Sequence, residues 1–177
     1  AGITGAERNG VGMHGAAFDA NLAIAKVASG YQYSFSNAIK AAEWGKSLGS
    51  AAINVSAEVN YDRAFRDSIV KTAAGEYYST HWYYGENGYN GAVKEAVKWK
   101  AALGDEQVLV KAAGNAGWDY SAGMNQMATA TDANGNLILD GQMIVVGNWD
   151  ENNSKLNSSS NKAGTVCATM QNGVCID

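Results

Sequence analysis

The sequence predicts an α/β fold: a three-layer, doubly wound, mostly parallel sheet in one domain. Short apolar runs typical of buried strands alternate with amphipathic stretches typical of helices. The chain has 177 residues, of which 46% are hydrophobic, and this is enough for one core. Neither an internal repeat nor a linker divides it. Right-handed crossovers are expected between the strands.

Four short apolar runs are the expected strands. Each is rich in β-branched or small apolar residues, as in strands that are buried on both faces. They are "ANLAIAKV" (20–27), "SAAINVS" (50–56), "QVLVKAAG" (107–114) and "QMIVVGN" (142–148).

The first expected helix lies between the first two strands, in "YSFSNAIKAAEWGKSLG". Phe35, Ile39, Ala42 and Leu48 are near helical spacing, and Gly49 is placed to end the helix.

The second expected helix is "GAVKEAVKWKAALG", with Asn90 as its N-terminal cap and Gly104 at its end. Its expected apolar stripe is Val93, Val97 and Leu103, while Lys94 and Lys98 face outward.

An insertion is expected over about 60–90. It begins with a helical segment from Asn60 to about Ala74 and continues into "GEYYSTHWYYGENGYNG". Two interpretations of these aromatic residues stay open: a loop that packs on its own rings, and a rim that contacts substrate. Further on, "TDANGNLILDGQ" is typical of a small hairpin.

Charge and hydropathy exclude two classes of partner. The net charge is −4 and no basic run occurs, which argues against nucleic acid. No apolar stretch approaches the ~18 residues of a membrane span, so no membrane segment is expected.

The two cysteines flank an Asn-Gly turn signal in "CATMQNGVC". A hairpin there would bring Cys167 and Cys175 within bridging distance, which favours an exported protein. Two free thiols in a cytosolic protein remain the alternative.

Two polar residues follow expected strands, at the sheet edge where α/β proteins collect ligands. They are Ser56 and Asn115. The asparagine amide is suited to donating toward a developing negative charge, and the neighbouring glycines let a substrate backbone approach. The alternative is a left-handed turn asparagine without a functional role.

Five blocks of the sequence, taken in order, resemble successive blocks of the subtilases, the subtilisin-like serine peptidases. The blocks are "GVGMHGAAFDANLAIAKV", "GYQYSFSNAIKAAEWG", "AAINVSAEV", "VLVKAAGNAG" and "QMIVVGNWDENNSKLNSSSNKAG". "GMHGAAFDANL" and "SNKAGTVCATMQNGVCID" are most similar to the bacterial autotransporter branch. The resemblance implies a truncated subtilisin-like fold, one partial subtilase domain over 1–177, and a secreted or cell-surface bacterial parent.

The resemblance also assigns roles to particular residues. Asn115 matches the side-chain donor of the oxyanion hole. Three groups match substrate-binding elements: the strand edge Ser56, Ala57 and Glu58; the second edge Gly30, Tyr31, Gln32 and Tyr33; and the pocket floor Ala112, Ala113 and Gly114. Glu58 departs from the usual glycine, which leaves the shape of that pocket open.

The family's Asp, His and Ser triad matches no position in the chain. "AGITGA" resembles the continuation of the histidine motif, so the histidine and the aspartate are expected before Ala1 and the serine after Asp177. Neither His14 nor His81 aligns with the catalytic histidine, and both are expected to be structural.

A loop near the beginning, "ERNGVGM", matches the family's calcium-binding loop. Its oxygen donors would be the side chain of Asn9 and the main-chain carbonyls of Glu7, Val11 and Met13. Because calcium takes six to eight oxygens, calcium is expected only in a full-length parent, and no cofactor is expected for this chain.

We therefore expect the central part of a serine endopeptidase whose parent acts on peptides or proteins, and which is inactive alone. The alternative is a non-catalytic module that captures an extended peptide by β-addition. A nucleotide-binding domain is disfavoured because no G-x-G-x-x-G or P-loop follows the first strand. Exposed sheet edges predict self-association.

Overall fold

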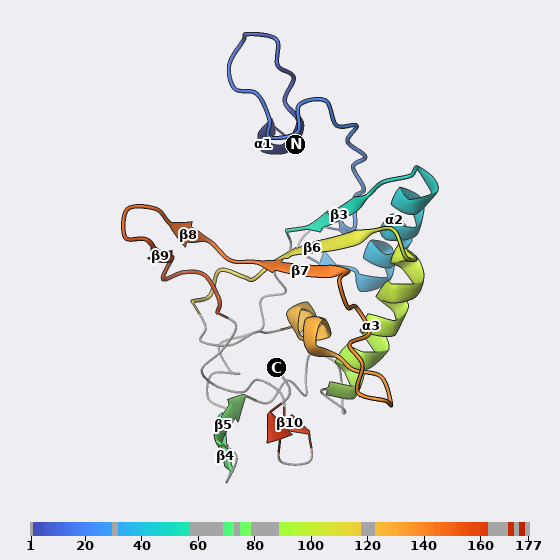
Figure 1. The fold of residues 1–177 in the computed structure, drawn as a ribbon, viewed down its shortest axis with the longest axis vertical. Helices are drawn as coiled ribbons and strands as arrows, with labels where there is room; N and C mark the ends of the chain where they lie inside the picture. Colours follow the sequence, from blue (N-terminus) through green and yellow to red (C-terminus); the bar gives the residue numbers. More distant parts are fainter. Residues whose placement is uncertain are drawn as a thin grey trace.

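The computed structural model describes residues 2–29, 32–56, 69–72, 75–78, 89–117, 123–162, 170–171 and 174–175. Within these ranges the chain is a mixed α/β protein built on a parallel sheet (Figure 1). Before this sheet, a four-residue helix, α1 (Gly2–Gly5), and a loop lie apart from the rest of the chain.

The central sheet has three parallel strands in the order β3-β6-β7. Ile53, Leu109 and Met143 lie side by side across it, so all three strands end at the same edge. Three of the four predicted strands are thereby confirmed, as β3 (Ala52–Val55), β6 (Val108–Ala112) and β7 (Met143–Val146).

The prediction of a strand at 20–27 is wrong. This segment carries no strand, and Leu22 and Ile24 are 45% and 77% exposed. Its apolar pattern is that of a strand, but no neighbouring strand forms a ladder with it. It leads instead into a short antiparallel pair, β1 (Ala28–Ser29) with β2 (Gln32–Tyr33).

Helix α2 (Phe35–Ser47) forms where the sequence predicts it. The Ser34 side chain caps its start by accepting from the Asn37 N–H at 3.3 Å. Gly49 ends it with φ at 74°, a conformation that glycine adopts without strain. Leu48, which the sequence grouped with the apolar positions of this helix, lies just beyond its end and is 57% exposed.

Helix α3 (Tyr89–Leu103) forms in the predicted region but differs from the prediction at two residues. Asn90 lies inside the helix rather than capping it, and Val97 is 54% exposed rather than part of the buried stripe. Val97 lies two positions before Trp99, and two positions are more than half a turn of an α-helix. The buried face is Ala96, Trp99, Ala102 and Leu103.

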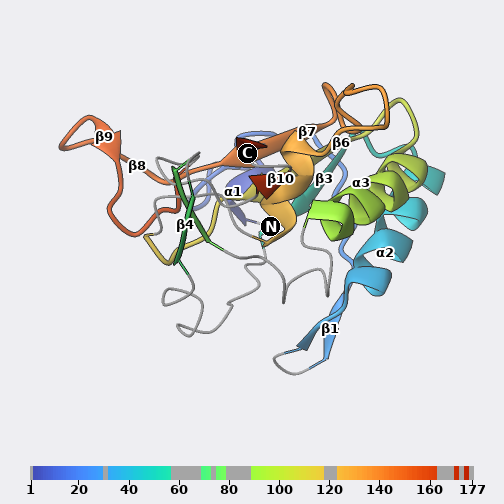
Figure 2. The ribbon, with the colours of Figure 1, turned by 90° about the horizontal axis from the view of Figure 1, so that it is seen from below.

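The hydrophobic core lies between one face of the sheet and the helices α2, α3 and η2 (Gly123–Thr129) (Figures 1 and 2). On the opposite face, Ile144 and Val146 are 52% and 49% exposed. The described residues thus show a sheet with helices on one face, and the second helical layer of a doubly wound fold is not among them. The core residues are Ala38, Ala42, Val55, Ala96, Trp99, Ala102, Leu103, Leu109, Met124, Met127, Ala130 and Leu139.

Short hairpins complete the described part of the chain. β4 (Ile69–Thr72) and β5 (Gly75–Tyr78) pair antiparallel, which overturns the predicted helix over residues 69–72. The rest of that predicted helix, 60–68 and 73–74, lies outside the described residues. The predicted hairpin near 131–137 is present as a bridge between Thr131 and Leu137. Two further antiparallel pairs are β8 (Trp149–Asp150) with β9 (Lys155–Leu156), and β10 (Met170–Gln171) with β11 (Val174–Cys175).

None of the helices in the described ranges has the length and apolar character needed to cross a membrane.

Candidate functional site

The candidate site is the carboxyl edge of the parallel sheet. Ser56 follows β3, the segment 113–117 follows β6, and Gly147 and Asn148 follow β7. The Ala113 N–H donates to the Val146 carbonyl at 2.9 Å, which continues the pairing just past the end of β6. The β8–β9 hairpin lies on this side, at the end of the molecule opposite α2 and α3 in both views (Figures 1 and 2).

The loop after β6 owes its shape to two glycines. Gly114 and Gly117 have φ of 108° and 65°, in the region that favours glycine. A Cβ on Gly117 would lie 2.5 Å from the Ser158 carbonyl oxygen, so the loop also needs glycine for close approach.

Asn115 lies between these glycines and is exposed at the sheet edge. Among the described residues, Ser154 is the one non-glycine residue with positive φ, so Asn115 is not a left-handed turn residue. The left-handed conformation belongs to its neighbour Gly114. The conformational explanation for an asparagine at this position therefore fails.

Asn161 holds the loop on both sides of Asn115. Its N–H donates to the Gly114 carbonyl at 3.0 Å, and its side-chain oxygen accepts from the Ala116 N–H at 3.1 Å. Asn161 is 3% exposed, so these bonds are largely shielded from water. The Gly117 N–H adds a third bond, to the Ser159 carbonyl at 2.8 Å. The backbone around Asn115 is thus fixed by the segment 157–161.

The same segment ties down the end of β7. The buried hydroxyl of Ser160 accepts from the Asn148 N–H at 3.0 Å. The loops after β6 and β7 are therefore joined through neighbouring residues, Ser160 and Asn161.

Beneath the loop lies a buried polar pair, Lys111 and Asn125. Lys111 is 3% exposed, and its ammonium donates to the Ala112 carbonyl at 2.7 Å. The Asn125 amide donates to the carbonyls of Ala112 and Ala113 at 3.3 and 2.9 Å. The predicted pocket floor, Ala112 to Gly114, therefore has its carbonyls engaged from below and from Asn161.

Sequence reasoning missed Asn125 and Asn161. Asn125 lies in "GMNQMA", where two amides interrupt an apolar run, and buried amides require hydrogen-bond partners. Asn161 lies in a stretch that is otherwise typical of a solvated turn, and no local signal distinguishes it from its neighbours.

The other predicted substrate-binding residues are brought together only in part. The Ser56 hydroxyl is at the same edge as Asn115 and accepts from the Asn54 amide at 2.9 Å. Gln32 and Tyr33 form β2. Gly30, Tyr31, Ala57 and Glu58 lie outside the described residues, as do Cys167 and His81. Cys175 ends β11, opposite Met170.

All four residues of the predicted calcium loop lie within the described part of the chain. The Asn9 side-chain oxygen accepts from the Val11 N–H at 3.1 Å, and its amide donates to Glu7 at 3.4 Å. The Asn9 oxygen and the carbonyls of Glu7, Val11 and Met13 are four candidate ligands, against the six to eight that calcium takes, so calcium binding stays a prediction for a full-length parent. Throughout the described ranges, no three His, Cys, Asp or Glu side chains gather as a metal site.

The exposed His14 contacts an aromatic neighbour. Its ring meets Phe18 edge to face at 6.0 Å, and the Arg8 guanidinium lies 5.5 Å from the centroid of the same Phe18 ring. This cluster belongs to the segment before the sheet and is not part of its carboxyl edge.

Comparison with protein-family models, with curated proteins and with solved structures found no match.

Proposed function

We propose that this chain is the central part of a subtilisin-like serine endopeptidase domain, with oxyanion-hole and substrate-binding elements but without the triad. The observation that carries the proposal is the fixed loop around Asn115. An exposed amide follows the middle strand of a parallel sheet, and the backbone on both sides of it is held by Asn161.

This arrangement supports an oxyanion role for physical reasons. A donor stabilises a developing charge best when its position is set before the reaction, because no reorganisation is then required. Hydrogen bonds from Asn161 at 3.0 and 3.1 Å set the backbone on either side of Asn115. Ser56, at the same edge, begins the segment expected to pair with a substrate backbone.

Each residue then has a part in the parent's reaction. Ser56, with Ala57 and Glu58, aligns the peptide; the floor from Ala112 to Gly114 receives the side chain before the scissile bond; and the Asn115 amide donates to the oxyanion. The nucleophile and its base come from outside this chain. Because no residue here matches them, the chain alone does not hydrolyse peptides.

The first test measures hydrolysis of fluorescein-labelled casein by the purified chain and by its Asn115→Ala variant. We expect no turnover from either protein. Turnover by the purified chain that Asn115→Ala abolishes would overturn the claim of inactivity.

The second test titrates the isotope-labelled chain with an extended peptide while amide chemical shifts are followed. We expect weak binding, above about 10 µM, with shifts at Ser56 and from Ala112 to Asn115. A complex of this strength corresponds to less than about 7 kcal/mol, as expected for a cleft that lacks its other walls. Nanomolar binding at these residues would instead establish the peptide-binding module, and shifts confined to other residues would exclude both functions.

A further inference from the structure

We propose that Asn152, in the turn of the β8–β9 hairpin, is an acceptor of N-linked glycosylation by an oligosaccharyltransferase. Asn152-Asn153-Ser154 is an Asn-x-Ser motif, and the chain has two others, which begin at Asn54 and Asn157. Because the motif is short, the structure decides which of the three asparagines is accessible. The proposal does not involve the peptidase site, and it rests on the predicted export of the chain.

Asn152 lies on a turn that projects from the molecule. In both views the β8–β9 hairpin is at the end opposite α2 and α3 (Figures 1 and 2). Residues 151–155 are all exposed, and none of these five residues is in the hydrophobic core. Ser154 has φ of 49°, so the chain reverses sharply here. A transferase can therefore reach the turn without displacing a packed element.

Both chemical groups of the motif are unengaged in this turn. Within the described ranges, no hydrogen bond involves the Asn152 side-chain amide or the Ser154 hydroxyl. The turn is held by Asp150, whose carboxylate accepts from the main-chain N–H groups of Asn152 and Asn153 at 3.1 and 3.3 Å. β8 and β9 form a two-stranded sheet of two residues each, and isolated hairpins are marginally stable. The turn can therefore open into an extended acceptor segment.

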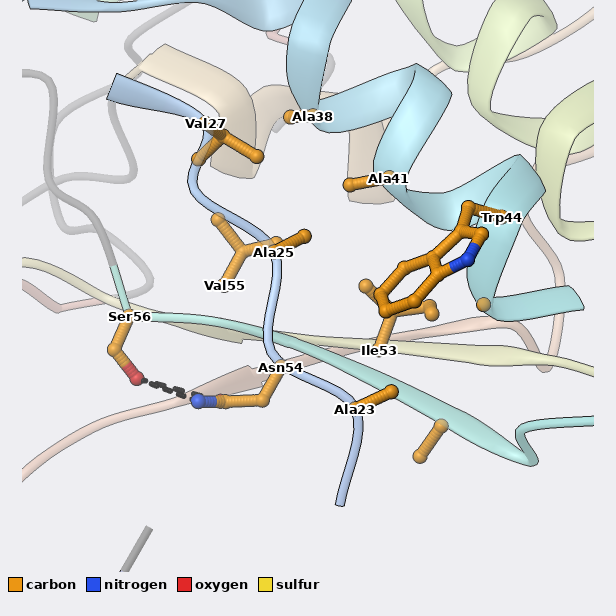
Figure 3. Close-up of a pocket in the computed structure, with 12 residues that line it drawn as sticks. Ala23, Ala25, Val27, Ala38, Ala41, Trp44, Ile53, Asn54, Val55 and Ser56 are labelled. Carbon is orange, nitrogen blue, oxygen red and sulfur yellow. Dashed lines mark hydrogen bonds between the residues drawn. The ribbon is translucent and has the colours of Figure 1, made fainter. Parts of the chain in front are cut away.

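The motif at Asn54 is inside the central sheet. Asn54 is in β3, which pairs with β6. Its amide donates to the Ser56 hydroxyl at 2.9 Å, so the two groups of this motif are bonded to each other (Figure 3). Glycosylation here would require β3 to leave the sheet.

The motif at Asn157 is tied to the loops at the sheet edge. Asn157 is half-buried, and its N–H donates to the Asn148 carbonyl at 2.8 Å. Its side-chain oxygen accepts from the N–H and the hydroxyl of Ser159 at 3.0 and 2.9 Å. The structure thus favours Asn152 over both of the other asparagines.

An acidic residue precedes Asn152 by two positions, which distinguishes its motif from the other two. The residue is Asp150, whereas the other motifs have alanine and lysine there. Bacterial oligosaccharyltransferases read a longer motif of this form, in which the carboxylate can make a charge-assisted contact with a cation of the enzyme. Opening of the turn releases Asp150 for this contact. The sequence Asp-Glu-Asn-Asn-Ser therefore fits a bacterial transferase.

The reaction transfers an oligosaccharide from a polyprenyl-pyrophosphate donor to the Asn152 side chain. The amide nitrogen attacks C1 of the first sugar, and the N–C1 bond forms as the C1–O bond to the pyrophosphate breaks. Polyprenyl pyrophosphate leaves with the bonding electron pair, and the nitrogen gives one proton to a base of the transferase. An amide nitrogen is a weak nucleophile because its lone pair is delocalised into the carbonyl, so an unengaged amide is required.

The test incubates the folded chain with a purified bacterial oligosaccharyltransferase and an undecaprenyl-pyrophosphate-linked oligosaccharide. Intact-protein mass spectrometry counts the glycans, and peptide fragmentation locates them. We expect one glycan per chain, on Asn152. Asn152→Gln is expected to carry none, whereas Asn157→Gln is expected to be modified like the wild type.

Two matched pairs of variants test the motif itself. Ser154→Ala removes the hydroxyl and is expected to abolish modification, whereas Ser159→Ala leaves it unchanged. Asp150→Ala is expected to slow modification by about tenfold or more, the loss of one charge-assisted contact, whereas Asp150→Glu keeps the charge and stays close to the wild-type rate. Asn115→Ala is expected to be modified normally, so failure of the proposed peptidase function would not be mistaken for failure here.

A second transferase, one that reads Asn-x-Ser without the acidic residue, tests the role of the fold. Synthetic peptides that contain Asn54, Asn152 or Asn157 are all expected to be acceptors. In the folded chain, only Asn152 is expected to be modified.

Three results would contradict the proposal. The first is a folded chain that stays unmodified under conditions in which a known acceptor protein is modified. The second is modification of Asn54 or Asn157 in the folded chain at the rate of Asn152, because the fold would then not select the acceptor. The third is an Asp150→Ala variant that the bacterial transferase modifies at the wild-type rate.

Discussion

Asn161 and Gly114 are joined through their main chains, with the Asn161 N–H donating to the Gly114 carbonyl at 3.0 Å. The Asn161 side chain continues this contact by accepting from Ala116 at 3.1 Å. Two segments that are distant in sequence thus form one loop structure at the sheet edge. The position of Asn115 depends on Asn161 as much as on β6.

Removal of the Asn161 side chain is expected to destabilise the protein. Asn161→Ala leaves the half-buried Ala116 N–H without its side-chain acceptor, and we expect a loss of about 1–3 kcal/mol in the free energy of unfolding. Urea unfolding measures it. The control is Asn148→Ala. Asn148 is exposed, and its main-chain N–H still donates to Ser160 after the substitution, so we expect the free energy of unfolding to change by less than about 0.5 kcal/mol. Equal losses would show that Asn161 does not hold the loop.

Two glycine-to-alanine variants separate the cost of the close contact at Gly117 from the cost of a left-handed backbone. Gly117→Ala would place a Cβ 2.5 Å from the Ser158 carbonyl oxygen at φ of 65°, whereas Gly135→Ala, at φ of 85°, meets nothing within 4 Å. Both variants incur the cost of a left-handed alanine, about 1–2 kcal/mol. Gly117→Ala is expected to cost more, and the difference in unfolding free energy measures the contact. A difference of zero would mean that the loop relaxes away from Ser158.

The parts of this fold that could be predicted are those determined by residues adjacent in the sequence. Gly49 and Gly104 end their helices as expected, and the three confirmed strands lie in short, mainly apolar runs, with Asn54 in β3 and Lys111 in β6 as the polar exceptions. The local pattern is not sufficient for the segment 20–27. Its pattern fits a strand, but a strand forms only where another strand pairs with it. At the site, the placement of Asn115 directly after β6 was predictable, because the strand and the two flanking glycines are adjacent to it in the sequence.

The support of the site was not predictable, because it comes from distant segments. Asn125 and Asn161 act on the loop from η2 and from the turn after β9. Val97 was misplaced for a related reason: Val93, Val97 and Leu103 were grouped by their apolar character alone. Small residues also belong to the buried side of α3, which consists of Ala96, Trp99, Ala102 and Leu103, and Val97 lies away from it.

Substitutions in α3 test which of its faces is buried. Leu103 is fully buried, so Leu103→Ala is expected to lower stability by about 2–5 kcal/mol. Val97→Ala, in the same helix at 54% exposure, is expected to change it by less than about 0.5 kcal/mol. Thermal or urea unfolding compares them. A large loss in Val97→Ala would restore the stripe predicted from sequence.

Two exposed aspartates are expected to titrate below their usual range. Backbone donation from Asn136 is the main cause that lowers the pKa of Asp132 below 3.8, whereas side-chain donation from Asn153 is the main cause for Asp150. Asn136→Ala keeps the backbone donor and is expected to move the pKa of Asp132 little. Asn153→Ala removes the main donor and is expected to raise the pKa of Asp150 clearly. Carboxyl NMR titrations measure both, and the reverse ranking would contradict the assignment.

The sign of the stability effect follows from these lowered pKa values. A carboxyl whose pKa is lower in the folded state adds stability above its unfolded pKa and loses it as the pH falls through the folded pKa. When the pH is lowered below about 4, the melting temperature of the wild type is therefore expected to decrease, and that of Asp150→Asn is expected to decrease less. An identical acid profile in this variant would show that Asp150 does not contribute to the linkage.

The open face of the sheet is expected to drive self-association. Ile144 and Val146 are two positions apart in β7, lie on the face opposite the helices and are 52% and 49% exposed. Exposed apolar patches of this kind commonly mark interaction sites. Replacement of both by threonine keeps a β-branched shape but adds hydroxyls, and it is expected to shift the chain toward monomer in light scattering. Val97→Thr, an exposed apolar position on α3, is expected to leave association unchanged. A wild-type chain that stays monomeric at high concentration, or a double variant that associates equally well, would exclude this face as the cause.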